Sequence, residues 1–398
     1  MEKFITNVIN NNYNSLIRKS RCSKTQAQTL KKLGTQILKT GKSVLHHLKD
    51  NSNKSAKKQG ERFGTMLEKV DLQKIVNDKI LSRFLKTMTN DTVIAYDLTD
   101  EIHKYADTRK QGMENISKVF DGSERSAKNG FFVHGVGTDT FLLRLDPHNS
   151  GKNTLPQVRK EILEELILKF KGKGIFAFDR GNDSKVLFRF CYDTNLKFLV
   201  RLQQKRSLCL IKTGEELSVE KLPLGRFEVY IKNSKNEKYD TKRKYWVIKK
   251  QPFLDKDPIS ILFSENLINY SDKELIKKYL ERWGIENQFR RIKTIYNYES
   301  MLVRKWNRRK NLTAIILFSH FLSKIIQIKF EKEKNKTDSS FFIAQHELKI
   351  FLNSLSKDYN DYSFVDFLRK KIPDNLAFFL RVKIQNNLSF NNLTLFPI

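Results

Sequence analysis

The order of the apolar segments between residues 91 and 206 constrains the fold of this chain more than any other feature of its sequence. Three short apolar runs of strand length come first, followed by a helix, a strand, a second helix and a last strand. The expected strands are 93–97, 131–137, 140–145, 174–178 and 198–202, and the expected helices are 156–170 and 184–192. Strands that alternate with helices predict a mixed α/β domain, in which helices cover the faces of a sheet.

The same order is the layout of an RNase H-like core, and the later segments fit this interpretation. From residue 207 to residue 264 the apolar runs are all strand-like, which indicates a β-rich insertion. We therefore expect the core to occupy residues 91–206, to be interrupted at 207–264, and to resume at 265–335. Residues 336–398 mix helical turns with loops, and there we expect a C-terminal helical region that could serve dimerisation.

The first 90 residues are basic and lack strand-like alternation, which predicts a helical region. They hold 19 lysines and arginines against 6 acidic residues, and the whole chain carries a formal charge of +31. So large a charge favours a polyanionic partner, so we expect residues 1–90 to bind DNA. The candidate phosphate contacts are Arg18, Lys19, Arg21 and Lys24. A solvated helix face or a dimer interface is the alternative role of this region.

Several classes of protein do not fit the sequence. Met1–Arg21 is rich in polar and basic residues, unlike a signal peptide. The most apolar stretch, Leu312–Ile328, contains His320 and Lys324 and therefore predicts a buried helix, with no membrane partner. The three cysteines are scattered without a CxxC pair, which argues against a zinc finger and favours a reduced cytoplasm. Without a glycine-rich phosphate loop in the sequence, we expect no nucleotide cofactor.

The sharpest chemical pattern lies on a helix predicted over Ser271–Ile295. At about 100° per residue, four of its polar side chains fall within an arc of roughly 60°. They are Tyr279, Arg282, Glu286 and Lys293, with Arg290 close to the same arc. On such a face the carboxylate can hold a metal ion while the cations and the phenol contact phosphates. A solvent-exposed ion pair between Arg282 and Glu286, at i and i+4, is the alternative interpretation.

The spacing Tyr-x2-Arg-x3-Glu-x6-Lys from Tyr279 to Lys293 resembles the signature of the DDE transposases of the insertion-sequence-four group. The segments Tyr96–Asp100 and Phe178–Asp183 resemble those that carry this family's two aspartates, and the resemblance covers roughly residues 90–310. It implies a bacterial, nucleoid-associated enzyme for cut-and-paste transposition, which cleaves and transfers DNA strands. The implied partners are the terminal inverted repeats and the target DNA, bound by a homodimer in a synaptic complex.

The resemblance implies a catalytic triad of Asp97, Asp179 and Glu286. Three acids brought together without a cation would repel one another, whereas hard oxygen ligands suit Mg²⁺ or Mn²⁺. We expect two ions, with Asp97 bridging both and each of the other carboxylates completing one. Asp100 and Asp183 lie nearby in the sequence and are the alternatives, although Asp97 and Asp179 each follow an apolar run.

The remaining signature residues are expected to act on DNA. Tyr279, Arg282 and Lys293 would grip phosphates near the transposon end, although Lys293 could instead balance the charge of the acidic site. Trp246 is a candidate for stacking on a flipped base, with packing in the core as the alternative. A basic segment after the helix adds candidate contacts or, alternatively, a helix start packed through Trp306. Its candidate DNA contacts are Arg304, Lys305, Arg308 and Arg309.

Three other functions remain open at this point. A structure-selective nuclease would keep the fold and the triad but would not require flanking inverted repeats. A domesticated transposase would bind DNA without cutting it, and an eroded triad would indicate this, whereas all three acids are present here. A basic structural or RNA-binding protein would account for the charge but not for the pattern on the helix.

Overall fold

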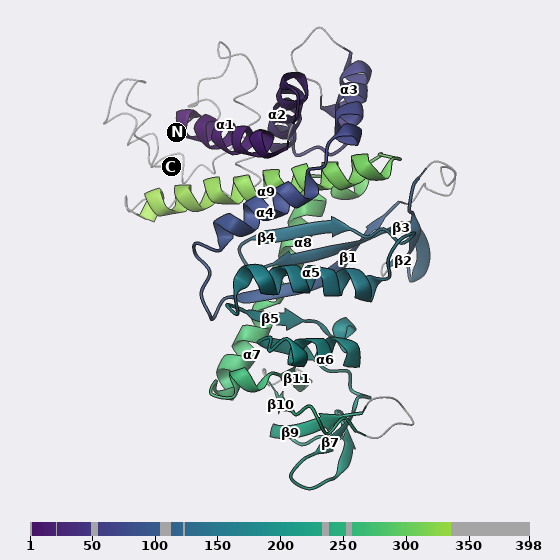
Figure 1. Cartoon of the computed structure of the whole chain (residues 1–398), viewed down its shortest axis with the longest axis vertical. Helices are drawn as coiled ribbons and strands as arrows, with labels where there is room; N and C mark the ends of the chain where they lie inside the picture. Colours follow the sequence, from purple (N-terminus) through teal and green to yellow (C-terminus); the bar gives the residue numbers. More distant parts are fainter. Residues whose placement is uncertain are drawn as a thin grey trace, which may run out of the picture. The chain divides into compact units, whose positions relative to one another are not determined.

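The computed structural model describes residues 2–20, 22–48, 55–103, 113–121, 124–232, 239–251 and 257–335 (Figure 1). The chain divides into two compact units. We call Asn77–Arg290 the sheet unit, and Met1–Val76 together with Arg291–Ile398 the helical unit. The C-terminal region predicted at 336–398 lies outside the described residues.

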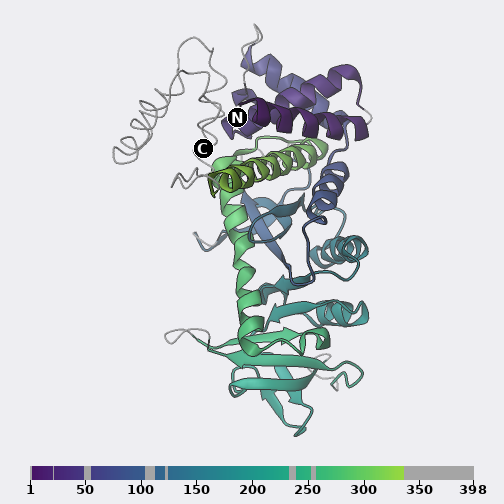
Figure 2. The same ribbon diagram turned by 90° about the vertical axis from the view of Figure 1, so that its left-hand side faces the viewer.

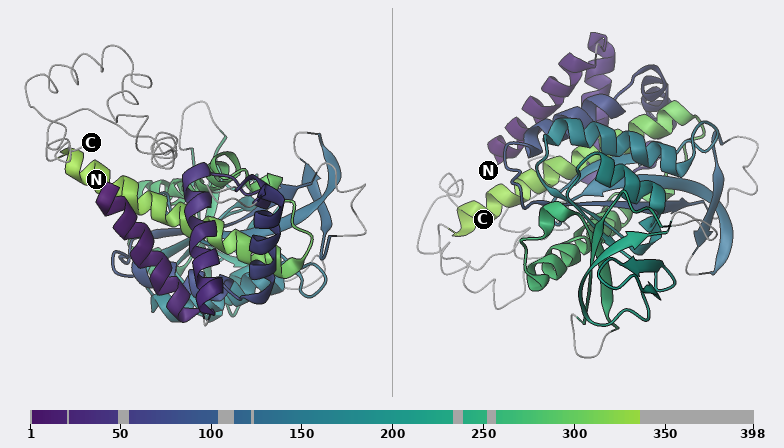
Figure 3. Two further views of the ribbon diagram at one scale, coloured as in Figure 1. Left: turned by 90° about the horizontal axis from the view of Figure 1, so that it is seen from above. Right: turned by 60° about the horizontal axis from the view of Figure 1, so that its bottom comes forward.

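The helical unit is built around its longest helix, α9. Helices α1, α2 and α3 all pack against α9, as the left-hand view of Figure 3 shows. The 23 residues Trp306–Ile328 are long and apolar enough to cross a membrane, but 83% of the apolar 18-residue window within them is buried inside the protein, as in a core helix. The elements of this unit are α1 (Glu2–Lys19), α2 (Lys24–Thr40), η1 (Leu45–His47), α3 (Ala56–Lys69), η5 (Tyr298–Ser300) and α9 (Trp306–Asn335), and α4 (Gln73–Phe84) starts here.

Tyr13 shows why α1, α2 and α9 pack so closely. Its ring meets Phe318 edge to face at 5.3 Å, and its hydroxyl shares a 3.0 Å hydrogen bond with Ser319. A Cβ at position 34 would lie 2.1 Å from the same ring, so only glycine fits there. The buried tyrosine thus joins three helices through one side chain, and its hydroxyl has a partner in the core.

The sheet unit is a mixed α/β structure, which confirms the predicted fold class at this level. Its sheet has the strand order β2-β3-β1-β5-β6-β11-β10-β9-β7-β8, with β4 paired to β3. Strand β1 pairs with β3 antiparallel and with β5 parallel, and β5 pairs with β6 parallel. The strands are β1 (Val93–Ile102), β2 (Ser117–Asp121), β3 (Ser126–Gly137), β4 (Leu142–Pro147), β5 (Ile175–Phe178), β6 (Phe198–Arg201), β7 (Ser207–Leu210), β8 (Glu216–Ser218), β9 (Gly225–Ile231), β10 (Tyr245–Lys250) and β11 (Ile259–Phe263).

Helices cover both faces of this sheet. In Figure 2, α5 (Leu155–Phe170) and α6 (Lys185–Asp193) lie on one face, while α7 (Asp272–Glu281) and the first part of α8 (Trp283–Ile295) lie on the other. Phe170 of α5 packs on Phe176 of β5, at 6.0 Å between ring centroids. On the opposite face, Leu275 and Ile276 of α7 join the core cluster that includes Leu199 of β6. Both faces therefore gain apolar burial, which is the main source of stability for a sheet of this kind.

The structure differs from the sequence predictions in three places. Strand β1 continues to Ile102, because β3 provides hydrogen-bond partners as far as that residue. Asp97 therefore lies within a strand and not at its end. Strands β2 and β8 were not predicted. The helix predicted over Ser271–Ile295 is two helices, because at Arg282 the N–H bonds the Tyr279 carbonyl, a tighter i to i−3 turn.

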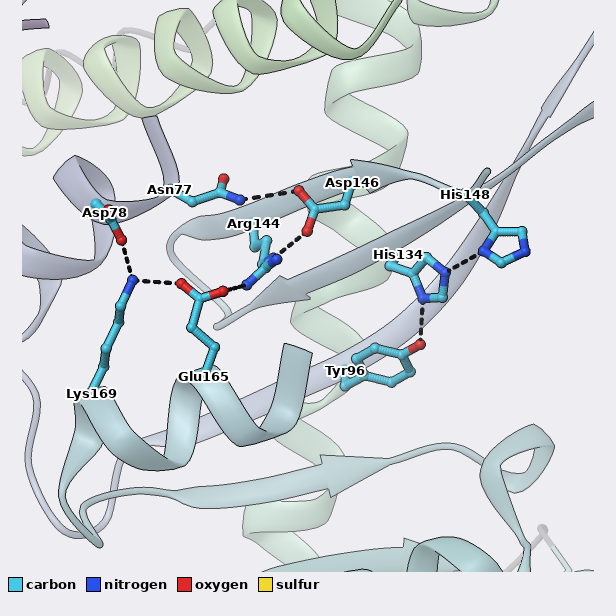
Figure 4. A network of polar contacts seen from close by, with 9 residues as sticks. All are labelled: Asn77, Asp78, Tyr96, His134, Arg144, Asp146, His148, Glu165 and Lys169. Atoms are coloured by element: carbon cyan, nitrogen blue, oxygen red, sulfur yellow. Dashed lines mark hydrogen bonds and ion pairs between the residues drawn. The ribbon is translucent and has the colours of Figure 1, made fainter. Parts of the chain in front are cut away.

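A chain of ion pairs fixes α5 to the edge of the sheet. Arg144 of β4 donates to Asp146 and, at 2.6 Å, to Glu165 of α5, as Figure 4 shows. Glu165 also accepts a 2.6 Å bond from Lys169, which pairs in turn with Asp78 of α4. Arg144 and Asp146 are the least exposed members, at 14% and 8%, so loss of the Arg144 guanidinium would leave Asp146 buried without its cation.

A second buried polar group orients β1. The Tyr96 hydroxyl shares a 2.7 Å hydrogen bond with Nδ1 of His134, and Nε2 of His134 lies 3.2 Å from Nδ1 of His148 (Figure 4). Burial lowers the pKa of His134 to about 3, so the ring stays neutral. Because successive side chains on a strand point to opposite faces, anchoring Tyr96 on this side directs Asp97 to the other.

Candidate active site

Two aspartates meet where β1 and β5 run side by side. The strands are parallel, and Tyr96 pairs with Phe178, so Asp97 and Asp179 occupy the next position on neighbouring strands. Neighbouring strands lie about 4.8 Å apart. Phe178 stacks on Phe176, which packs on α5, and the Tyr96 ring lies 6.1 Å from that of Phe178, so both aspartates follow side chains that point to the α5 face. The register therefore brings both carboxylates to the same place on the α8 side of the sheet.

Asp97 lies in a buried, negatively charged environment. Its side chain is 15% exposed, and Oδ1 accepts a 2.9 Å hydrogen bond from the Leu98 N–H. Burial and then the charge of Asp179 raise the pKa of Asp97 to about 7, although Arg282 opposes the shift. A cation bound beside Asp97 would favour its charged form and lower this pKa.

Asp179 is held by residues that the sequence analysis did not single out. Its Oδ1 accepts a 3.1 Å hydrogen bond from the Asn182 N–H and a second from the Asn182 side chain. Asn182 is fixed in turn, because Arg159 of α5 donates to its Oδ1 at 2.8 Å. The spacing Asp-x-x-Asn is typical of a carboxylate that caps a short helical turn, and this was the available signal.

Glu286 is linked to Asp97 through Arg282. The guanidinium donates from Nη2 to Oε1 of Glu286 at 2.8 Å and from Nη1 to Oδ2 of Asp97 at 3.2 Å. Arg282 is only 5% exposed, whereas the Glu286 side chain is 51% exposed. Arg282 and Glu286 do pair at i and i+4, as in the alternative interpretation, but the pair is anchored on Asp97 at the sheet.

The start of α8 is seated on the turn between β3 and β4. Gln288 donates from its amide to the Asp139 carbonyl at 2.7 Å, and the Phe289 ring lies against Gly135. A Cβ at Gly284 would lie 2.3 Å from Cα of Asp139. Gly284 and Gln288 are one helical turn apart, so they dock one face of α8 and fix the position of Glu286 between them.

We predict that Gly284→Ala destabilises the sheet unit by about 2 kcal/mol or more, because a backbone atom cannot yield to the added methyl. Thermal unfolding measures this, with Gly64→Ala of α3 as the control, because a Cβ at that helical glycine would meet only the flexible end of Arg308, at 3.1 Å. An unfolding temperature at or above that of the wild type would contradict the close contact.

The family model described as "Transposase DDE domain" matches residues 91–322, more than half of the chain. The chain belongs to this family. Among solved structures, the chain is similar to a cryo-electron microscopy structure of the piggyBac transposase synaptic complex with hairpin DNA, at 11% identity and a TM-score of 0.44, over 97% of this chain and 83% of that one. A search of curated proteins gave no significant match.

Within this transposase DDE domain, two aromatic residues predicted to contact DNA lie in or against the core. Tyr279 is 1% exposed and belongs to the apolar cluster under α7, with the Arg282 guanidinium 5.9 Å from its ring centre. The Tyr279 ring thus packs between the core and the Arg282 guanidinium. It does not lie on the exposed face of the helix with Glu286. Trp246 of β10 packs against the same cluster and lies 6.5 Å from the Phe263 ring.

The cations predicted to bind DNA differ in how far they are exposed. Arg308 pairs with Glu68 at 2.7 Å, and Lys293 pairs with Glu299 at 2.9 Å. Arg309 is 1% exposed and donates to the Val303 carbonyl, so the structure places it inside the helical unit. Those that lie exposed are Arg18, Lys19, Lys24, Arg290, Arg304 and Lys305, while Arg21 is outside the described residues.

The two alternative aspartates have different surroundings. The Asp183 carboxylate is fully buried and accepts hydrogen bonds from Arg206 and from the Gln203 N–H at 2.7 Å. It joins the loops after β5 and β6, which is a structural role. Asp100 lies three positions after Asp97 on β1, so its side chain leaves the strand on the other face.

The three carboxylates suit a hard divalent cation by their chemistry, because all their donors are oxygen atoms. Among the described residues no three acidic, His or Cys side chains converge tightly enough to chelate an ion in this conformation. The guanidinium that lies between Asp97 and Glu286 accounts for their separation. The raised pKa of Asp97 and this enclosed cation both indicate a site that requires positive charge.

Proposed function

We propose that this protein is a transposase that cleaves DNA at the terminal inverted repeats of its own insertion sequence and transfers the released strands to a target. Asp97, Asp179 and Glu286 are its catalytic carboxylates. The observation that carries the proposal is the pairing of β1 with β5, which sets two aspartates side by side, together with the Arg282 bridge to Glu286.

The proposal assigns an RNase H-like core to the sheet unit. The order β4-β3-β1-β5-β6, with β1 antiparallel to β3 and parallel to β5, supports it. Strands β7 to β11 form the β-rich insertion, and β11 pairs with β6, so the insertion extends the same sheet. Helix α8 then brings the third acid back to the two strands.

We further assign the protein to the insertion-sequence-four group through its Tyr-Arg-Glu-Lys signature. The positions of Tyr279 under Arg282, and of Arg282 between two acids, give this spacing a physical reason. A tyrosine one turn before the arginine packs against its guanidinium, and a glutamate one turn after it accepts a hydrogen bond from one of the terminal nitrogens. Lys293 lies two further turns along α8, where it contacts Glu299.

Asp97, Asp179 and Glu286 would hold two Mg²⁺ or Mn²⁺ ions. Bound there, the ions would supply activation of the attacking hydroxyl and stabilisation of the charge that develops at the phosphate. The protein itself supplies position: Asn182 orients Asp179, the Leu98 N–H orients Asp97, and the seat of α8 orients Glu286. The arginine contributes a donor that can bind a phosphate oxygen.

The partners we propose are the duplex ends of the element and the target DNA, bound by a homodimer in a synaptic complex. The charge of +31 supports a polyanionic partner, and the exposed Arg18, Lys19 and Lys24 at the junction of α1 and α2 are candidate contacts. The protein would then act without a nucleotide cofactor in the bacterial cytoplasm, associated with the nucleoid.

The test is cleavage of a labelled duplex that carries the DNA flanking the gene, with Mg²⁺ or Mn²⁺, by the wild type and by Glu286→Gln. We expect 3′-hydroxyl ends from the wild type alone and only in the presence of metal. Cleavage of branched DNA without regard to the terminal repeats would instead indicate a structure-selective nuclease. Salt-sensitive binding without cleavage by either protein would indicate a non-catalytic DNA-binding protein.

A further inference from the structure

Arg282 is the one cation that contacts two members of the proposed triad in the described residues. Its Nη1 and Nη2 atoms lie 3.2 Å from Asp97 and 2.8 Å from Glu286, and the side chain is nearly inaccessible to solvent. A buried guanidinium between two carboxylates compensates charges that would otherwise repel each other. It therefore does electrostatically what a divalent cation would do at the same place.

The guanidinium and a divalent cation cannot both be shared by Asp97 and Glu286. Magnesium binds carboxylate oxygens at about 2.1 Å, so two carboxylates that share an ion lie closer together than two that span a guanidinium. In addition, the guanidinium and the metal ion would compete for the negative charge of the same two carboxylates. The arginine must move before these acids can converge on a metal ion.

Arg282 also has a donor that the two carboxylates do not use. Its Nε atom is buried and has no hydrogen-bond partner among the described residues, so part of its donor capacity is unused. It lies at the junction of α7 and α8, where the helical hydrogen bonds tighten to i−3. A phosphate that approached the guanidinium could accept hydrogen bonds from Nε and from one terminal nitrogen at once. Neither Asp97 nor Glu286 makes such a bidentate contact with Arg282 in this structure.

From this geometry we propose that Arg282 is a resident counter-cation that the DNA substrate removes, so that DNA binding increases the affinity of the site for divalent metal. A phosphate draws the guanidinium away from Asp97 and Glu286, and the acids become free to bind the ion. By linkage, bound metal raises the affinity for DNA by the same factor. The inference rests on the proposed function, since it needs these acids to be metal ligands.

The experiment measures Mn²⁺ affinity by the electron paramagnetic resonance signal of the free ion, without DNA, for the wild type and for Arg282→Met. We expect Arg282→Met to bind Mn²⁺ about tenfold more tightly, because the competing charge is gone. Lys278→Met is the matched control: it removes one positive charge from α7, where Lys278 pairs with Asp91 outside the triad. Its affinity should remain that of the wild type.

A second measurement uses the wild type alone and covers the case in which Arg282→Met does not fold. Adding a duplex that carries the terminal repeat, with a methylene group in place of the 3′ oxygen at the scissile position so that it cannot be cleaved, should raise the Mn²⁺ affinity of the protein about tenfold after the Mn²⁺ bound by the duplex alone is subtracted. Equal affinity with and without the duplex would overturn the proposal, as would weaker or unchanged binding by folded Arg282→Met.

Two further variants separate this inference from the proposed function. If Asp97→Asn and Glu286→Gln leave Mn²⁺ binding intact, then these acids are not metal ligands and the proposed function fails with the inference. If both variants abolish binding while Arg282→Met fails to tighten it, only the counter-cation role is wrong.

Discussion

Asp97→Asn and Asp179→Asn are each expected to lower DNA cleavage by about 10³-fold or more, with little change in affinity for the terminal-repeat duplex. A metal ion stabilises the transition state by several kcal/mol, and each 1.36 kcal/mol corresponds to a tenfold change in rate. An amide keeps the shape of the carboxyl but loses its charge. Single-turnover cleavage measures the rate, and a gel-shift titration at fixed salt measures the binding.

The two alternative aspartates provide matched controls for this prediction. Asp100→Asn changes the same strand on its other face and should cleave at close to the wild-type rate. Asp183→Asn removes a charge that Arg206 and the Gln203 N–H require, so it should lower the unfolding temperature. If Asp100→Asn lost cleavage as fully as Asp97→Asn, the assignment of the first acid would be wrong.

Much of the sheet unit could be predicted because its apolar runs are short and end at recognisable positions. Residues 174–178 and 198–202 are buried on both faces of a parallel pair, and such strands appear as continuous apolar runs. Strand β1 has a second half rich in polar residues, so only its apolar half was apparent. Its extension depends on pairing with β3, whose residues follow 28 or more positions later in the chain, and a local sequence pattern cannot show such a partner.

The candidate site was only partly accessible from sequence for the same reason. Spacing places Tyr279, Arg282 and Glu286 on one arc of an ideal helix, but it does not say which side of that arc meets the sheet. Because α7 packs on the core, Tyr279 is inside, Arg282 lies at the edge, and Glu286 is half exposed. The support from Asn182 depends on a turn, and the seat at Gly284 depends on a contact with a distant loop.

The raised pKa of Asp97 predicts a dependence of stability on pH that the Asp97→Asn variant should lack. With a pKa of about 7 in the fold, Asp97 is protonated at pH 5.5, whereas in the unfolded chain, at 3.8, it is ionised. The folded state therefore holds a proton that the unfolded state has lost. The stabilisation is complete below pH 3.8 and disappears as pH rises through 7.

Between pH 5.5 and pH 8, in the absence of metal, this one group should cost the wild type about 2 kcal/mol of stability, a difference of several degrees in unfolding temperature. Thermal unfolding in a chelator at both pH values, with Asp97→Asn alongside, measures the contribution of Asp97 together with that of the acids coupled to it, while groups remote from the site titrate alike in both proteins. Parallel pH profiles would mean that Asp97 has an ordinary pKa.

Because a bound cation must displace the same proton from Asp97, the affinity for Mn²⁺ should rise by up to tenfold per pH unit below pH 7 and should level off above it.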